Sequence, residues 1–429
     1  MAEREMNDEL SRFIELGIFR IGSSNAIFMD PVRVLSASYS RFRVSPHAYY
    51  SRSFESKPGG ETAVSVNPRK RKLKQRKSYS LNERELIADQ RHQEARPLLL
   101  GAYEAFLETV GLLSFLPNIK DDPHYSVENE HLVTSVGREI GQSLFELGSV
   151  WQAPLYEISL HFRPQNRLAE DGEGSPIVQH GETEVVPVFN NLVINETSED
   201  VEAEFLDSLY IIPRESCFHM SDLKQIQNLI PAQCGQGFNL IVIDPPWENR
   251  SAHQKSVYPT LPNRYFLSIP MKQLIHTEGA LVALWVTNKE KLRVFVEKEL
   301  FPMWGVRYTA IFYWLKVKVD GSLISDLDLF HHRPYECLLL GYSDREGVDT
   351  DHHSTFKPIH GNQVIISIPG DYSRKPPIGK LLLDYVPGPK PARCIELFAR
   401  ELLDGWTSWG NEPLHFQESR YFLRKKMEE

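Results

Sequence analysis

Cysteine is scarce in this chain of 429 residues, which contains only Cys217, Cys234, Cys337 and Cys394. These four lie far apart, whereas structural zinc sites and disulfide frameworks use closely spaced pairs. The scarcity excludes a fold that depends on disulfides. It predicts a reducing compartment and no bound metal.

Long apolar runs are also missing. No stretch approaches the roughly 20 consecutive apolar residues that a membrane-spanning helix needs, so we expect no contact with a membrane. The first nine residues are rich in charge and lack the apolar block of a signal peptide. A hydrophobic content of 41% and a charged content of 24% are typical of a globular protein with a buried core.

An overall excess of positive charge is absent as well. The net charge of −9 argues against a protein that binds nucleic acid over its whole surface. Residues 69–77 are the local exception, with seven basic residues in nine. Such a run is typical of a nuclear import signal or a phosphate-binding arm, although a solvated loop has the same composition. We therefore expect a nuclear protein that has a polyanionic partner.

The chain divides into three predicted segments. Residues 1–80 form an arm of weak strands that ends in the basic run, 81–210 an accessory region of mixed structure, and 211–429 the catalytic domain. In the accessory region Ser80 is the expected N-cap of a helical stretch. Pro97 is expected to divide that stretch into two helices, because proline lacks the N–H that the helix needs. Residues 163–184 are predicted to form a long surface loop.

From residue 238 onward the pattern changes to short apolar runs separated by helical stretches. Strands are expected at 238–243, 280–286, 308–315, 336–340 and 364–368, and a helix at 290–300. Alternating strands and helices predict an α/β fold with a doubly wound, mostly parallel sheet. Ligands of such sheets bind at the carboxyl ends of the strands.

The tetrapeptide Asp244-Pro245-Pro246-Trp247 stands at that end of the first strand. Its groups suit methylation of an exocyclic adenine amine, whose lone pair is delocalised into the ring. Asp244 can accept one amine proton in a hydrogen bond, and the rigidly held carbonyl of Pro245 can accept the other. Trp247 offers a face on which a flipped base can stack. The alternative is a simple turn after a strand, with a packed aromatic ring.

The tetrapeptide resembles the Asp/Asn-Pro-Pro-aromatic signature of amino methyltransferases. Its Trp form, with these flanks, is similar to that of the eukaryotic adenine-N6 methyltransferases. Within that family the chain is most similar to the methyltransferase-like protein 4 group. The resemblance covers residues 211–420 and rests on stretches 284–288, 314–316, 333–336, 375–377 and 395–412.

The resemblance implies a permuted, Rossmann-like class I methyltransferase domain that uses S-adenosyl-L-methionine. No glycine-rich turn precedes Asp244, which agrees with a permuted order in which the cofactor strand comes last. Residues at positions where the family binds the cofactor are Met220, Ser221, Asp244, Ser373, Lys375, Phe398, Arg400, Asn411 and Glu412. Lys375 is expected at the methionine carboxylate, with Ser373 beside it. Arg400, Asn411 and Glu412 are expected at the ribose, although the His-Asn pair that follows the arginine elsewhere in the family is missing.

On the substrate side the resemblance places Asn249, Arg250 and Tyr258 in an active-site loop, and Trp314 beside the pocket. It implies a monomer that acts on RNA, with 2′-O-methyladenosine of U2 small nuclear RNA as the expected target. DNA adenine is an alternative substrate. A catalytically silent RNA-binding scaffold is an alternative function, but the complete tetrapeptide argues against it.

Overall fold

The computed structural model describes residues 10–22, 24–51, 82–119, 159–162, 184–205, 208–232, 236–248, 260–330, 332–343, 357–370 and 374–425. Its centre is an 11-stranded sheet. In spatial order the strands are β1 (Ile18–Arg20), β2 (Ala26–Met29), β14 (Gln363–Ser367), β12 (Arg307–Lys316), β13 (Tyr335–Ser343), β11 (Ala280–Val286), β10 (Leu240–Ile243), β15 (Cys394–Leu397), β16 (Trp406–Gly410), β9 (Ser216–Met220) and β6 (Leu192–Asn195).

The middle of this sheet is parallel. Strand β10 pairs in parallel with β11 and β15, and β16 continues the parallel run to β9. Strand β13 runs antiparallel between β11 and β12. All residues of β10 and β11 are buried, as expected for strands that are covered on both faces. The predicted α/β class with a mostly parallel sheet is confirmed, and so are the five strands expected between residues 238 and 368.

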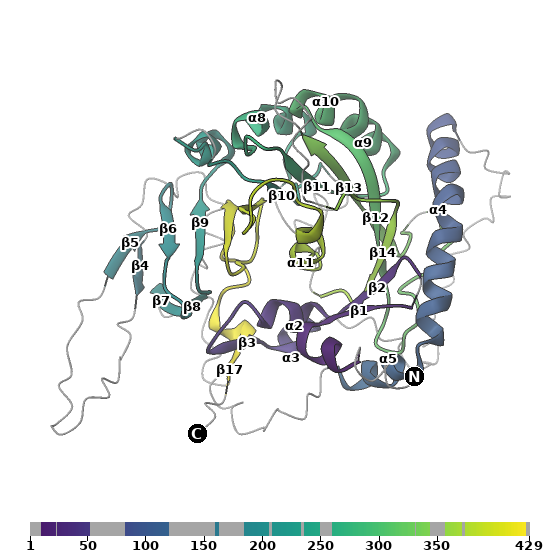
Figure 1. The fold of residues 1–429 in the computed structure, drawn as a ribbon, viewed down its shortest axis with the longest axis horizontal. Helices are drawn as coiled ribbons and strands as arrows, with labels where there is room; N and C mark the ends of the chain where they lie inside the picture. The colour runs from purple at the N-terminus through teal and green to yellow at the C-terminus, as the bar shows by residue number, and fades with distance from the viewer. Residues whose placement is uncertain are drawn as a thin grey trace, which may run out of the picture.

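Helices cover both faces and one end of the sheet (Figure 1). The expected helix at 290–300 is present as α9 (Glu290–Phe295), a π-helical turn (Val296–Leu300) and α10 (Phe301–Trp304). The shorter helices are α2 (Pro31–Ser36), α3 (Pro46–Tyr49), α5 (Val110–Phe115), α8 (Met271–Leu274) and α11 (Gly379–Leu382).

The long helix α4 (Glu83–Glu108) corrects one prediction, because it passes through Pro97 without a break. Losing one helical hydrogen bond and bending the chain costs about 3 kcal/mol. Burial of Leu99 and Phe106, both 0% exposed, offsets that cost. The N-cap of the helix is Asn82, whose side chain forms a capping box with Glu85. The N-cap was expected two residues earlier, at Ser80.

The central sheet takes strands from all three predicted segments. Strands β1 and β2 come from the N-terminal arm, and β2 pairs in parallel with β14 of the catalytic domain. At the opposite edge, β6 of the accessory region pairs with β9. The predicted boundary at residue 211 therefore does not separate two sheets.

Two smaller sheets complete the described fold. One has the order β5 (Glu184–Pro187), β4 (Ser159–Phe162), β7 (Val201–Phe205) and β8 (Ser208–Ile212), and the other pairs β17 (Phe422–Arg424) with β3 (Phe42–Val44). Glu184, the last residue of the predicted surface loop, opens β5. Residues 163–183 of that loop lie outside the described residues.

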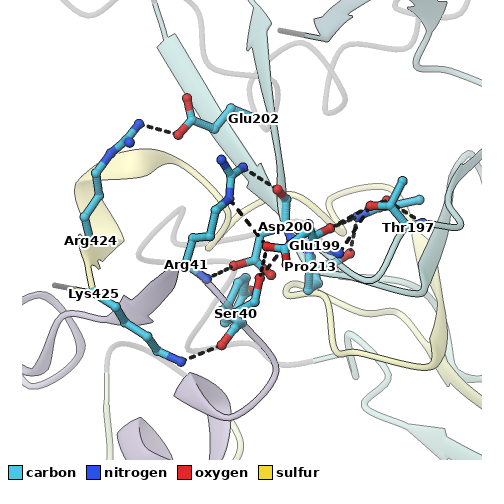
Figure 2. A network of polar contacts seen from close by, with 11 residues as sticks. Ser40, Arg41, Thr197, Glu199, Asp200, Glu202, Pro213, Arg424 and Lys425 are labelled. Atoms are coloured by element: carbon cyan, nitrogen blue, oxygen red, sulfur yellow. Dashed lines mark hydrogen bonds and ion pairs between the residues drawn. The ribbon is translucent and has the colours of Figure 1, made fainter. Parts of the chain in front are cut away.

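A polar network joins residues 40–41 and Arg424 to the segment 199–202, which leads into β7 (Figure 2). The Arg41 backbone N–H donates to Asp200 Oδ2 at 2.8 Å, and the Ser40 hydroxyl donates to Glu199 Oε2 at 2.9 Å. From the C-terminal side, Arg424 pairs with Glu202. The N-terminal arm is thus fastened into the fold by hydrogen bonds as well as by strand pairing.

Among the described residues, no single helix has the length and apolar character to span a membrane. Helix α4 and residues 110–118 pass that test only when taken together, and they are bent by 70° with respect to one another.

Candidate active site

Asp244 directly follows β10, and Phe398 directly follows the neighbouring strand β15. The register aligns Ile243 with Leu397, and the Asp244 N–H donates to the Leu397 carbonyl at 3.3 Å. A cavity opens at these two strand ends. Its walls include Asp244, Trp285, Arg374, Lys375, Pro376, Pro377, Glu396, Phe398, Arg400, Glu401 and Trp406. Three predicted cofactor residues, Lys375, Phe398 and Arg400, therefore share one cavity with Asp244.

A chain of alternating charges runs through this site. The Lys375 ammonium lies 3.3 Å from Asp244 Oδ1 and 3.3 Å from Glu336 Oε2, and Lys316 pairs with the other oxygen of Glu336. Burial by itself would raise the pKa of Glu336, but Lys316 and Lys375 lower it to about 2. Burial would likewise lower the pKa of Lys375, but Asp244 and Glu336 raise it. Glu336 and Lys375 are thus both charged at neutral pH.

Glu336 was not among the predicted site residues. In the sequence it is marked only as a charged residue near the start of a largely apolar strand, β13. Its partners, however, come from β12 and from the segment that follows β14, and only the fold brings them together.

Two further carboxyl groups have unusual protonation behaviour. Burial raises the pKa of Glu396 to about 8, with Glu401 and Asp244 adding to the shift and Arg400 opposing it. Burial also raises the pKa of Glu412 to about 7. Glu396 lines the cavity and was missed by the sequence prediction, because a single glutamate inside a strand carries no pattern that marks it as functional.

Trp247 takes a different role from the one predicted. Its side chain is 6% exposed, its indole N–H donates to the Trp285 carbonyl at 2.8 Å, and its ring packs edge-on against Phe266 at 5.0 Å. The ring therefore offers no free face on which a base could stack. It anchors the tetrapeptide to β11, and the Trp247 N–H also donates to the Pro245 carbonyl at 2.7 Å.

Trp314 is also buried rather than open to the cavity. Its side chain is 2% exposed, and its indole N–H donates to the Ser367 hydroxyl at 2.7 Å. The Lys316 ammonium lies 4.2 Å from the centre of its ring. Trp314 therefore does not have the predicted place beside the substrate. Instead its ring supports the side chain of Lys316.

The remaining predicted cofactor residues lie at neighbouring strand ends. Met220 ends β9 and aligns with Gly410, which precedes Asn411 and Glu412. The Ser221 hydroxyl accepts a hydrogen bond from the Trp409 indole at 2.9 Å, so its side chain is already engaged. These residues reach the same edge of the sheet as Asp244, but they do not line the cavity. Ser373, Asn249, Arg250 and Tyr258 lie outside the described residues.

The lining of the cavity fits a ligand that carries charges of both signs. Lys375 and Arg400 suit a carboxylate, and Asp244 suits an amine or another cationic centre. The aromatic rings of Phe398 and Trp406 add apolar surface. A methionine moiety with a positively charged sulfur has this combination of groups. Among the described residues, no group of His, Cys, Asp or Glu side chains is arranged to hold a metal ion.

Comparison with known proteins gives a consistent assignment. The profile of the MT-A70 family matches residues 238–412. N(6)-adenine-specific methyltransferase METTL4 of Mus musculus is 37% identical over 238 residues, which are 54% of this chain and 49% of the relative. The Homo sapiens METTL4 is 35% identical over 240 residues, 55% and 50% of the two chains.

A DNA N6-methyl methyltransferase of Caenorhabditis elegans is 34% identical over 220 residues, 50% of this chain and 56% of the relative. An N6-methyladenosine RNA methyltransferase, MTA1 of Pyricularia oryzae, is 36% identical over 218 residues, 49% and 55% of the two chains. The chain thus spans about half the length of these curated relatives.

Proposed function

We propose, from the premise that this chain belongs to the MT-A70 family and within it to the METTL4 group, that it methylates N6 of adenine in a nucleic acid. The observation that carries the proposal is the shared cavity, in which Asp244 of the tetrapeptide meets Lys375, Phe398 and Arg400. The cofactor is S-adenosyl-L-methionine, whose carboxylate and amine suit the opposite charges of the cavity.

The cofactor supplies an electrophilic methyl group on a sulfonium. Asp244 accepts one N–H of the adenine amine, and the second lone pair of the Pro245 carbonyl accepts the other. With both N–H bonds held, the nitrogen lone pair points away from the ring plane. On methyl transfer, Asp244 Oδ would take up one amine proton and release it to solvent.

The charge chain prepares Asp244 for this role. The Lys375 ammonium lies 3.3 Å from Asp244 Oδ1 and holds the carboxylate in place. Glu336 draws the same ammonium from the other side, so Lys375 is shared between two carboxylates. Because Lys375 is shared in this way, Asp244 can still accept a hydrogen bond from the substrate amine.

We further propose that the substrate is RNA, with 2′-O-methyladenosine of U2 small nuclear RNA as the target and the nucleus as the location. The resemblance to the METTL4 group and the basic run at 69–77 support this choice. The relative in Caenorhabditis elegans, named as a DNA enzyme, makes DNA the second candidate. Action as a monomer is supported by β1, β2 and α4, with which the chain covers its own catalytic sheet.

The decisive experiment is transfer of a labelled methyl group to matched RNA and DNA oligonucleotides, each with and without a 2′-O-methyl group on the target adenosine. Label on N6 of the modified RNA, at a rate at least about tenfold above that of the other substrates, supports the proposal. Preference for DNA would replace RNA as the substrate. No transfer to any oligonucleotide, with cofactor bound, would favour the scaffold.

A further inference from the structure

The residue before Lys375 is a buried arginine with aromatic rings on two sides. Only 3% of the Arg374 side chain is exposed. Its guanidinium carbon lies 4.4 Å from the ring centre of Tyr49 and 4.1 Å from that of Phe416. Its Nη2 and Nε donate to Glu401 Oε2 at 2.6 and 3.2 Å. We call Tyr49, Arg374 and Phe416 the arginine sandwich.

The sandwich joins segments that are far apart in the sequence. Tyr49 ends α3 in the N-terminal arm, Phe416 lies near the C-terminus, and Glu401 follows β15. The backbone before Arg374 also packs on the Tyr49 ring, because a Cβ built on Gly370 would lie only 2.6 Å from it. Glycine at this position permits the close approach.

Tyr49 is itself held in place. The Ser45 side chain caps α3, and Pro46 opens it. The neighbouring Tyr50 packs edge-on against Tyr49 at 4.9 Å and donates its hydroxyl to Asp30 Oδ1 at 3.0 Å. Asp30 in turn caps α2. The ring that contacts Arg374 therefore belongs to a rigid part of the arm.

The other two cations of the cavity, Lys375 and Arg400, depend on this arrangement. Lys375 follows Arg374 across one planar peptide unit, so an immobile Arg374 sets where the Lys375 side chain begins. The Phe416 N–H donates to the Arg400 carbonyl at 3.0 Å, and the Arg400 guanidinium lies 5.5 Å from the Phe416 ring. The arginine sandwich thus adjoins Lys375, which suits a carboxylate, and Arg400, which suits a ribose.

We infer that Tyr49 and Phe416 are positioning residues of the cofactor cavity, which act through Arg374 on Lys375 and Arg400. The N-terminal arm is thereby part of the cofactor site, although it lies outside the region matched by the family. This inference rests on the proposed function, since it assumes that the cavity binds S-adenosyl-L-methionine. A guanidinium between two rings is strongly attracted when it is desolvated.

The test measures affinity for S-adenosyl-L-methionine by calorimetry on the full chain. Tyr49→Leu removes the π face and should weaken binding about tenfold, whereas Tyr49→Phe keeps the face and should bind like the parent. In methyl transfer, Tyr49→Leu should raise KM for the cofactor and leave kcat at saturating cofactor close to parental. Phe416→Leu tests the sandwich from its other side and serves if Tyr49→Leu does not fold.

The matched control is Phe13→Leu. Phe13 is a fully buried aromatic residue of the same arm, and it packs on Phe19, Phe28 and Phe115. The Phe13→Leu variant should be less stable than the parent but should bind the cofactor with the same affinity. Parental affinity in the Leu variants of the sandwich, or an equal loss in the control, would overturn the inference alone. A parent with no affinity for the cofactor would refute the proposed function and the inference with it.

Discussion

At the scale of single residues, the carboxylate of Asp244 has two oxygens, and Oδ1 pairs with Lys375. Asp244→Asn keeps the size of the side chain but replaces one acceptor oxygen with a donor and breaks the ion pair with Lys375. We expect methyl transfer to fall by roughly 10²-fold or more, because the lost acceptor acts mainly in the transition state. Cofactor affinity, measured separately by calorimetry, should change far less. Activity within about threefold of the parent would remove Asp244 from the mechanism.

Glu336→Gln tests the charge chain at the same scale. The variant leaves Lys316 and Lys375 without their shared carboxylate, so the Lys375 ammonium should pair more closely with Asp244 and compete with the amine. We expect turnover to fall about tenfold, because Lys375 then competes with the substrate amine for Asp244. The exposed pair of Arg264 and Glu299 offers a matched control, because Glu299→Gln breaks a surface ion pair and should leave turnover unchanged.

The pKa of Glu396 gives a prediction about stability and pH. Its folded pKa is raised to about 8 from an ordinary 4.5, so the folded state binds a proton more tightly than the unfolded state. The stability of the parent should therefore fall as pH rises from 4.5 through 8. Glu396→Gln does not titrate, so it should gain about 4 kcal/mol over the parent at pH 9 relative to pH 5. Denaturant unfolding at both pH values measures the gain, and an equal difference at the two would contradict the raised pKa.

At the scale of elements, helix α4 contains Pro97 in its interior, where proline disfavours a helix. Pro97→Ala restores an N–H to the helix interior and removes the clash of the proline ring with the preceding turn. We expect the free energy of unfolding to rise by about 1–2 kcal/mol, less than the full cost of a proline, because alanine also frees the unfolded chain. Thermal unfolding measures this effect. A lower melting temperature would mean that Pro97 helps α4 to pack along the sheet.

At the scale of the whole molecule, the net charge of −9 leaves nucleic-acid binding to local basic segments. Deletion of residues 69–77 should weaken RNA binding and flatten its dependence on salt, because fewer counterions are released from phosphates. Deleting nine residues elsewhere in the arm, such as 55–63, provides a control with one basic residue instead of seven. Titrations by fluorescence anisotropy at several salt concentrations compare the two. Equal salt slopes in both deletions and in the parent would leave the basic run as a solvated loop.

The sequence by itself determined the elements of the catalytic half. The strands expected between residues 238 and 368 were found because each is a short apolar run, and a strand buried on both faces needs no other local signal. The same reasoning placed Asp244 at a strand end. The family resemblance, by contrast, supplied the order of the two halves and the roles of Lys375, Phe398 and Arg400.

Only the tertiary structure decided what each site residue touches. Trp247 belongs to the tetrapeptide and Trp314 to β12, and nothing local distinguishes a ring that stacks on a base from one that packs in the core. The local rule for Pro97 failed because burial of the α4 face offsets a local cost. Glu336 and Tyr49 could not be assigned at all, since their partners lie elsewhere in the chain. Ion pairs, burial and aromatic contacts between distant residues exist only once the sheet has assembled, so the sequence determines the strands and the fold determines the site.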